Sequence, residues 1–489
     1  MTPSGSPETA SSTATSPDER PSGDEVPSRD DRSPGDDRSP GRNRPGDDEL
    51  PPGPDGLPVV GNTHQFLRAG PYEFYDRLAT YGDVVGYRVA WRDFCTVLHP
   101  DYVEQVLVEE ADSFERFFFD EIGFEFAPEG LLMSSGEQWR RQRTLIQPAF
   151  RPDRIASYAD SMAEYAERTV EGWTDGEEIA LNREFSQLAL EILARSLFDL
   201  DVRAGGGAEA VTRAARALDE RADSRSPGAF LPDWVPTPAN RRYRRSMEQF
   251  RETVDGLIER RRRAPGEYDD LLAILLDAED ESGRTMSDEE VRDQMITFLF
   301  AGHETTSLAL TYAFLLLAQH DQVREKLDAE HERVLGGAAP TLADLDDLEY
   351  TETVIDEAMR LYPPAYVMFR EALEDVEIGG YRVPEGTVVT LPQFRLHVDE
   401  RFYDDPERFR PERWTDEFEE QLPEYAYFPF GGGPRHCIGM RFAMLELKTV
   451  LPTIAQRVDF ELLSDPDPDL GAGITLQPDE DVRMRVSKR

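Results

Sequence analysis

The stretch Phe430-Gly-Gly-Gly-Pro-Arg-His-Cys-Ile-Gly439 is the most informative part of this 489-residue chain. It places Cys437, one of only two cysteines, in a glycine-rich loop that runs into a segment without Gly or Pro, residues 440–450. This segment is expected to form a largely buried helix, so Cys437 lies at a helix N-terminus, where N–H groups and the dipole favour a thiolate. Such a sulfur is either a metal ligand or a nucleophile.

The pattern Phe-x-x-Gly-x-Arg-x-Cys-x-Gly, met at positions 430–439, resembles the haem-binding loop of the cytochrome P450 family. The resemblance implies that Cys437 is the thiolate ligand of haem iron, with Phe430 packed beneath the sulfur and Gly439 leaving room beside it. It also implies that Arg435 binds a haem propionate.

Two other interpretations of the loop were weighed against the haem site. A cysteine-dependent phosphatase would need an Arg six residues after the cysteine, where Ala443 stands. A purely structural cysteine would not need the neighbouring Arg435 and Phe430.

A second motif, Ala-Gly-His-Glu-Thr-Thr at 301–306, lies inside a long apolar helical segment. Gly302 within a helix costs about 1 kcal/mol, so a close approach or a local bulge is expected there. The motif resembles the distal helix of the same family, which implies that Thr305 holds dioxygen or a water and that Glu304 relays protons. The alternative is a capping or solvent-facing cluster, which the apolar sequence on both sides disfavours.

Three further residues resemble propionate-binding positions of the family. Trp139 and Arg143 are four apart on a predicted helix and can point the same way, and Arg370 follows a Tyr-Pro-Pro turn. A doubly anionic cofactor edge calls for several such cations. A surface position remains the alternative for Arg370.

Glu357 and Arg360 are three apart on a helix that Pro363 must end. The resemblance implies that Arg413, or else Arg410, joins them in a structural cluster. His303 and His436 are interpreted as local hydrogen-bonding residues rather than metal ligands.

The net charge of −44 is unusual for a chain of this length. The first fifty residues hold twelve acids and six arginines, so −38 remains on the rest, and only three lysines occur. Such a surface suggests hydration in molar salt and favours a halophilic archaeon as the source. Binding to a basic partner is the alternative, and nucleic-acid binding is excluded on electrostatic grounds.

Residues 1–50 contain no aromatic side chain and include a hexapeptide, Asp-Asp-Arg-Ser-Pro-Gly, repeated at 30–35 and 36–41. We expect this acidic Pro/Ser/Gly/Asp-rich extension to be disordered. With no signal peptide, no 18-residue apolar run and two distant cysteines, a soluble cytoplasmic protein without a membrane anchor is expected.

The remainder, 51–489, is predicted to be one catalytic domain, mainly α with small β-sheet regions. A hairpin is expected at Val84–Val97, with Cys95 in the core, and a second strand cluster at Val376–Leu391. Residues 137–335 are expected to be helical, with breaks near prolines 227, 232 and 236. The resemblance places haem between the distal long helix and the helix that follows the Cys loop.

The whole pattern predicts a monomeric haem-thiolate monooxygenase that uses haem b, O2 and a small apolar substrate, such as a fatty acid or an isoprenoid. Because no Gly-x-Gly-x-x-Gly follows a strand, a separate ferredoxin or flavoprotein is expected to supply electrons. A peroxygenase using H2O2 and a non-catalytic haem sensor are the alternatives.

Two sets of residues complete the prediction. The resemblance to the family implies that the substrate pocket is lined by Leu131, Leu132, Met133, Phe298, Ala301, Thr305, Ala365, Tyr366, Val367 and residues near Ile474. A basic surface for the electron donor is expected from Arg140, Arg141, Arg143 and Arg441, with Arg140 and Arg141 the better candidates.

Overall fold

The computed structural model describes residues 50–117, 127–200, 208–222, 235–264, 266–268 and 270–489. The predicted disorder of the N-terminal extension concerns residues that, apart from Leu50, lie outside this range. The breaks expected at Pro227 and Pro232 lie outside it as well. Pro236 stands two residues before a long helix, as expected.

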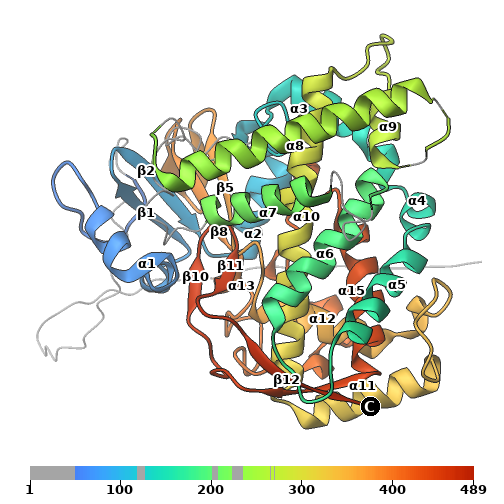
Figure 1. Cartoon of the computed structure of the whole chain (residues 1–489). Coiled ribbons are helices and arrows are strands. Elements are labelled where there is room, and N and C mark those ends of the chain that lie inside the picture. The colour runs from blue at the N-terminus through green and yellow to red at the C-terminus, as the bar shows by residue number, and fades with distance from the viewer. Residues whose placement is uncertain (1–49, 118–126, 201–207, 223–234, 265, 269) are drawn as a thin grey trace, which may run out of the picture. The chain divides into compact units, whose positions relative to one another are not determined.

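Helices dominate the described part of the chain, which confirms the mainly α prediction (Figure 1). Their bounds are α1 (Thr63–Leu78), α2 (Pro100–Glu104), α3 (Gly136–Ile146), α4 (Pro152–Ala156), α5 (Ala159–Gly172), α6 (Leu181–Phe198), α7 (Ala208–Ala222), α8 (Pro238–Arg263), α9 (Leu271–Asp277), α10 (Asp288–Leu317), α11 (Asp321–Val334), α12 (Glu349–Leu361), α13 (Gln393–Leu396), α14 (Asp416–Gln421) and α15 (Met440–Ala455).

The strands form small sheets. Their bounds are β1 (Val84–Val89), β2 (Arg92–Val97), β3 (Phe114–Arg116), β4 (Glu178–Ala180), β5 (Val367–Ala372), β6 (Val376–Ile378), β7 (Tyr381–Val383), β8 (Val388–Pro392), β9 (Val458–Leu462), β10 (Leu470–Ala472), β11 (Leu476–Pro478) and β12 (Arg483–Lys488). The largest sheet has the order β1-β2-β8-β5-β3, and both strand regions predicted from sequence belong to it or lie beside it.

The predicted hairpin is β1 paired antiparallel with β2, with Gly86 opposite Cys95. Cys95 is fully buried, and burial raises the pKa of its thiol to about 12, so it is an inert core residue as expected.

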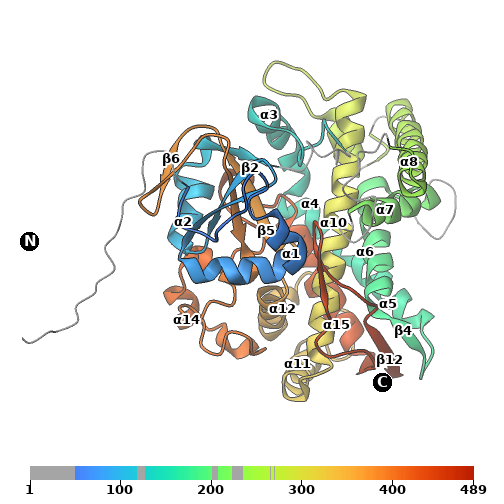
Figure 2. The ribbon, with the colours of Figure 1, turned by 90° about the vertical axis from the view of Figure 1, so that its left-hand side faces the viewer.

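Helix α10 runs through the middle of the helical part, with the five-stranded sheet and α1 to one side (Figures 1 and 2). It begins with a capping box between Ser287 and Glu290, and most of its following residues are buried, because neighbouring helices cover it on several sides. A Cβ on Gly302 would lie 2.9 Å from Leu193 Cδ1 of α6. The glycine therefore permits the close approach that its position in the sequence predicts.

Helix α15 begins at Met440, directly after the Cys loop, and packs against α10, α12 and α5. It extends beyond the predicted end at Val450 to Ala455 and contains Pro452. The apolar packing of its last turns, which are fully buried, offsets the backbone hydrogen bond that the proline cannot donate.

No helix in the described segments is long and apolar enough to cross a membrane.

Candidate functional site

The Cys loop has a backbone that only glycine fits. Gly431 and Gly433 have φ values of +71° and +63°, and a Cβ on Gly433 would lie 1.8 Å from the carbonyl oxygen of Leu107. The backbone N–H of Cys437 donates to the carbonyl oxygen of Phe430 at 2.9 Å. The loop thus presents the Cys437 sulfur at a fixed place, one turn before α15.

The Cys437 side chain is open on one side, whereas Cys95 is closed in. Burial by the rest of the loop raises the pKa of the Cys437 thiol, although the N–H groups of Gly439 and Met440 and the charge of Arg143 act in the opposite direction. The helix N-terminus and Arg143 therefore favour the thiolate of Cys437, as the sequence predicts, and burial opposes them. A bound metal cation would remove the proton outright.

An open stripe interrupts the buried surface of α10. Ala301 is exposed and Thr305, one turn later, is partly exposed, although His303 and Glu304 between them are buried. The Thr305 hydroxyl donates to the carbonyl oxygen of Ala301 at 2.8 Å, a back-bond that helical threonines commonly make. A partly exposed hydroxyl thus lies on the helix that packs against α15.

The guanidinium group of Arg435 stacks on the ring of Trp139, a residue of α3. Its guanidinium carbon is 4.3 Å from the centre of the Trp139 ring, and its Nη2 donates to the carbonyl oxygen of Ser134 at 3.1 Å. Trp139 therefore holds Arg435 in place through a cation–π contact.

Arg435 is part of a cluster of three guanidinium groups. Arg370 on β5 is buried and lies directly opposite Arg116 on β3. Desolvation, together with the charges of neighbouring arginines, lowers the pKa of Arg370 to about 10 and that of Arg435 to about 10. Three like charges in a partly desolvated space form a site for a multivalent anion.

Arg143 reaches the Cys loop from α3. Its Nη2 lies 3.2 Å from His436 Nε2, and His436 Nδ1 lies 3.0 Å from the carbonyl oxygen of Gly433. His436 is therefore a local hydrogen-bonding residue, as predicted. His303 is one too, with its Nδ1 2.7 Å from the carbonyl oxygen of Leu299.

Glu357 on α12 is the centre of a buried cluster of ion pairs that includes Arg360 and Arg413. Its carboxylate accepts from Arg360 at 2.8 Å and 2.9 Å, from Arg413 Nε at 2.8 Å, and from Trp414 Nε1 at 3.0 Å. Arg410 contributes only its backbone N–H. Arg413, and not Arg410, is therefore the residue whose side chain joins Glu357 and Arg360 in the cluster.

The predicted pocket segments meet around α10. The N–H of Leu131 donates to Gln294 Oε1 of α10 at 2.9 Å, and the Phe298 ring packs on Phe150. Tyr366 donates from its hydroxyl to the carbonyl oxygen of Gly473, next to Ile474, at 2.9 Å.

Comparison with known proteins decides the family. The family model of the cytochrome P450 matches residues 51–482. The chain is a cytochrome P450.

Its relatives include a cyclooctat-9-en-7-ol 5-monooxygenase of Streptomyces melanosporofaciens, 35% identical over 83% of this chain and 88% of the relative. A pentalenene oxygenase of Streptomyces avermitilis is 33% identical over 89% of this chain and 97% of the relative. A solved structure, the retinoic acid-bound cyanobacterial CYP120A1, aligns with a TM-score of 0.80 at 27% identity, over 90% of this chain and 99% of that one. This cytochrome P450 therefore has the fold of the family and is an oxidoreductase of the monooxygenase type.

Family membership implies a haem cofactor, and the residues present fit one. The cytochrome P450 offers an open cysteine sulfur before α15, an open Ala301–Thr305 stripe on α10, and a guanidinium cluster suited to two carboxylates. The sulfur and the Ala301–Thr305 stripe are open in a region that is otherwise buried, and the guanidinium groups gather positive charge where carboxylates can bind.

Arg116 was not predicted from the sequence, because nothing in its three-residue strand distinguishes it from a surface arginine. Only its pairing with Arg370, far away in the chain, brings it to the site.

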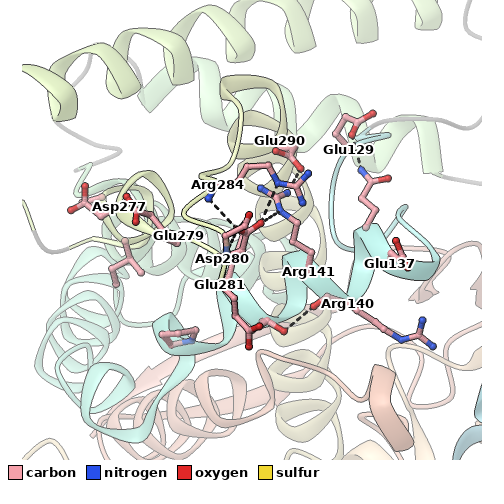
Figure 3. Close-up of a pocket in the computed structure, with 18 of the residues that line it drawn as sticks. Glu129, Glu137, Arg140, Arg141, Asp277, Glu279, Asp280, Glu281, Arg284 and Glu290 are labelled. Atoms are coloured by element: carbon pink, nitrogen blue, oxygen red, sulfur yellow. Dashed lines mark hydrogen bonds and ion pairs between the residues drawn. The ribbon is translucent and has the colours of Figure 1, made fainter.

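Arg141 is not the docking residue that the sequence predicts. A hollow of about 1180 Å³ separates α3 from the loop that leads into α10, and Arg141 spans one edge of it (Figure 3). It donates to Asp280 at 3.0 Å, Glu290 at 2.7 Å and the carbonyl oxygen of Thr285 at 2.7 Å. Arg140 points away from this hollow, is 61% exposed and pairs with the exposed Asp112.

Proposed function

We propose that this cytochrome P450 binds haem b through Cys437 and inserts one oxygen atom of O2 into a small apolar substrate of the isoprenoid class. The observation that carries the proposal is the combination of an open cysteine before α15 with three neighbouring arginines, which come from β3, β5 and the Cys loop. Two relatives, named for oxidation of cyclooctat-9-en-7-ol and of pentalenene, support an isoprenoid over a fatty acid.

The reaction that balances is RH + O2 + two electrons + two protons giving ROH + H2O. When bound, the haem supplies the binding and reductive cleavage of O2. Cys437 would hold the iron through its sulfur. Arg116, Arg370 and Arg435 would bind the propionates, with Trp139 fixing the orientation of Arg435 and Arg143 supporting the loop through His436.

Thr305 and Glu304 would handle the protons. The Thr305 hydroxyl faces the open side of α10 and can hold a water there, and Glu304 is the titratable group next to it. Apolar side chains of the 131–133 segment and of the hairpin near Ile474 would orient the substrate and exclude bulk water.

Electrons would come from a separate ferredoxin or flavoprotein reductase that docks on the Cys437 side. Arg140 is the candidate contact, because its side chain is exposed, and the exposed Arg441 at the start of α15 is a second. A peroxygenase is the second candidate function, but the Glu304–Thr305 pair serves proton delivery that a peroxide-driven reaction does not require.

The function is tested by reconstituting the purified protein with haem, a surrogate ferredoxin and its reductase, and isoprenoid probes. Product formed with NADPH and O2, in larger amount than with H2O2, supports the monooxygenase. Turnover with H2O2 alone supports the peroxygenase, and haem binding without turnover in either system supports the sensor.

We further propose that residues 51–489 form one catalytic domain, that the protein is a cytoplasmic monomer, and that its acidic surface is an adaptation to molar salt in a halophilic archaeon. The net charge of −44, carried mostly outside the first fifty residues, supports the adaptation to salt.

A further inference from the structure

The carboxylate of Glu304 is held by a residue of the C-terminal hairpin. Gln477 on β11 donates from Nε2 to Glu304 Oε1, and the same Nε2 lies 3.1 Å from Thr475 Oγ1. An amide nitrogen has two N–H groups, so both donors of Gln477 are used. Glu304 is only 5% exposed, and a buried carboxylate needs such donors.

The hairpin that carries Gln477 is fastened to α10 at a second point. The hydroxyl of Tyr312, two turns after Glu304 on α10, donates to the carbonyl oxygen of Leu476 at 2.7 Å. The N–H of Leu476 donates to the carbonyl oxygen of Pro364 at 2.9 Å. The backbone of β11 is therefore fixed, and the side chain of Gln477 starts from a defined position.

The acid and the alcohol of the motif have separate partners in this arrangement. Glu304 is bound to Gln477, while the Thr305 hydroxyl donates to the carbonyl oxygen of Ala301. The hairpin also carries Ile474, which borders the proposed substrate pocket, and accepts a hydrogen bond from Tyr366 at Gly473. This one short hairpin thus contacts Glu304 and also borders the proposed substrate pocket.

We propose that Gln477 is a positioning residue that sets the location of the Glu304 carboxylate and links proton delivery to the substrate-side hairpin. This inference rests on the proposed function, because it assigns Gln477 a role through Glu304. A glutamine that merely stabilised the hairpin would affect folding and substrate affinity, but it would not act specifically through the acid.

The test is a double-mutant cycle of Gln477→Met and Glu304→Gln in the haem-loaded full chain. With a surrogate ferredoxin and its reductase, peroxide released per NADPH consumed is measured in air-saturated buffer, with and without farnesol as an isoprenoid probe. We expect Gln477→Met to raise this ratio roughly two- to tenfold, the range of one hydrogen bond, because misplaced protons let reduced oxygen leave as peroxide. In the Glu304→Gln background the same substitution should have no further effect.

Two further measurements distinguish a positioning role of Gln477 from a general loss of folded structure. Farnesol turnover driven by H2O2, which brings its own protons and electrons, should be the same in Gln477→Met as in the parent protein. The urea midpoint of the haem-free protein should show non-additivity between Gln477→Met and Glu304→Met, because the hydrogen bond is made without haem and methionine, unlike glutamine, has no oxygen at position 304 to accept it. Gln187→Met removes a comparable bond to Glu191 on α6 and should leave the peroxide ratio unchanged.

The proposal is overturned if the effects of Gln477→Met and Glu304→Gln add, or if Glu304→Gln leaves the ratio unchanged. If Gln477→Met does not fold, Gln477→Asn, which keeps the amide but shortens its reach, takes its place with the same expected outcomes. Failure of the monooxygenase assignment is recognised in the parent protein, which would then form no farnesol product with NADPH and O2, whereas the carbon monoxide spectrum, which neither substitution should alter, checks that the haem ligand is intact.

Discussion

Arg116 and Arg370 lie directly opposite each other on β3 and β5, so two positive side chains face one another at the edge of the proposed haem site. Like charges in directly opposite positions destabilise a strand pair, by about 0.2–1 kcal/mol. The arrangement is stable when an anion lies between or beside them, and the haem propionates would supply that anion. Haem binding is therefore expected to weaken the repulsion between Arg116 and Arg370.

Arg116→Gln should affect haem retention more than the stability of the haem-free protein. Urea unfolding of the haem-free variant should change little, because relief of the repulsion with Arg370 offsets loss of the bond from Arg116 Nη2 to the carbonyl oxygen of Met133. Haem transfer to apomyoglobin should become roughly tenfold faster or more, since a charged hydrogen bond to a propionate is lost. Arg88→Gln, which removes an exposed arginine paired with Asp93, should leave haem transfer unchanged. Equal haem retention in both variants would show that Arg116 does not contact the cofactor.

Thr305→Ala should uncouple electron consumption from product formation. The hydroxyl that faces the open side of α10 is lost, so more reduced oxygen should leave as peroxide while NADPH consumption continues. The loss should be partial, because an ordered water can replace a hydroxyl. Thr311→Ala removes the same kind of back-bond on the same helix, from Oγ1 to the carbonyl oxygen of Ser307 at 2.7 Å, and is the matched control. If both variants form the same amount of product per NADPH consumed, Thr305 takes no part in proton delivery.

Neighbouring arginines of α3 should respond differently to charge reversal. Arg140→Glu should raise the KM for an acidic ferredoxin without changing the unfolding temperature, because Arg140 is exposed. Arg141→Glu should lower the unfolding temperature, because it places an acid beside Asp280 and Glu290. Reduction kinetics should be measured at the lowest salt at which both variants stay folded. Unchanged kinetics for Arg140→Glu would place the docking surface elsewhere.

Salt should stabilise the protein. At about 0.1 M ionic strength the Debye length is ~10 Å, and near 1 M it is ~3 Å, so repulsion among surface carboxylates is largely screened in molar salt. Thermal unfolding in increasing KCl should therefore show a rising midpoint up to the molar range. A maximum below physiological ionic strength would argue against adaptation to high salt.

The parts of the site that the sequence predicted are those encoded in short patterns. The Cys loop and the Ala301–Thr306 motif resemble short motifs of the family, and the hairpin at Val84–Val97 follows from local alternation, so neighbours within a few residues identify each of them. Arg116 could not be found this way, because the register between β3 and β5 joins segments more than two hundred residues apart.

Long-range partners also explain the other differences. Gln477 lies 173 residues from Glu304, and Arg141 lies 139 residues from Asp280. Both contacts depend on how the chain folds back on itself, which local propensity does not determine. In contrast, Arg413 was placed correctly beside Glu357, through the family resemblance rather than through any local pattern.

The absorption spectrum of the reduced protein with carbon monoxide tests the central claim most directly. An anionic sulfur ligand from Cys437 should give the red-shifted Soret band for which the family is named. Cys437→Ser should lose this band, whereas Cys95→Ser, at the buried core cysteine, should keep it. A protein that takes up no haem, a spectrum typical of histidine ligation, or a band that survives in Cys437→Ser would contradict the account.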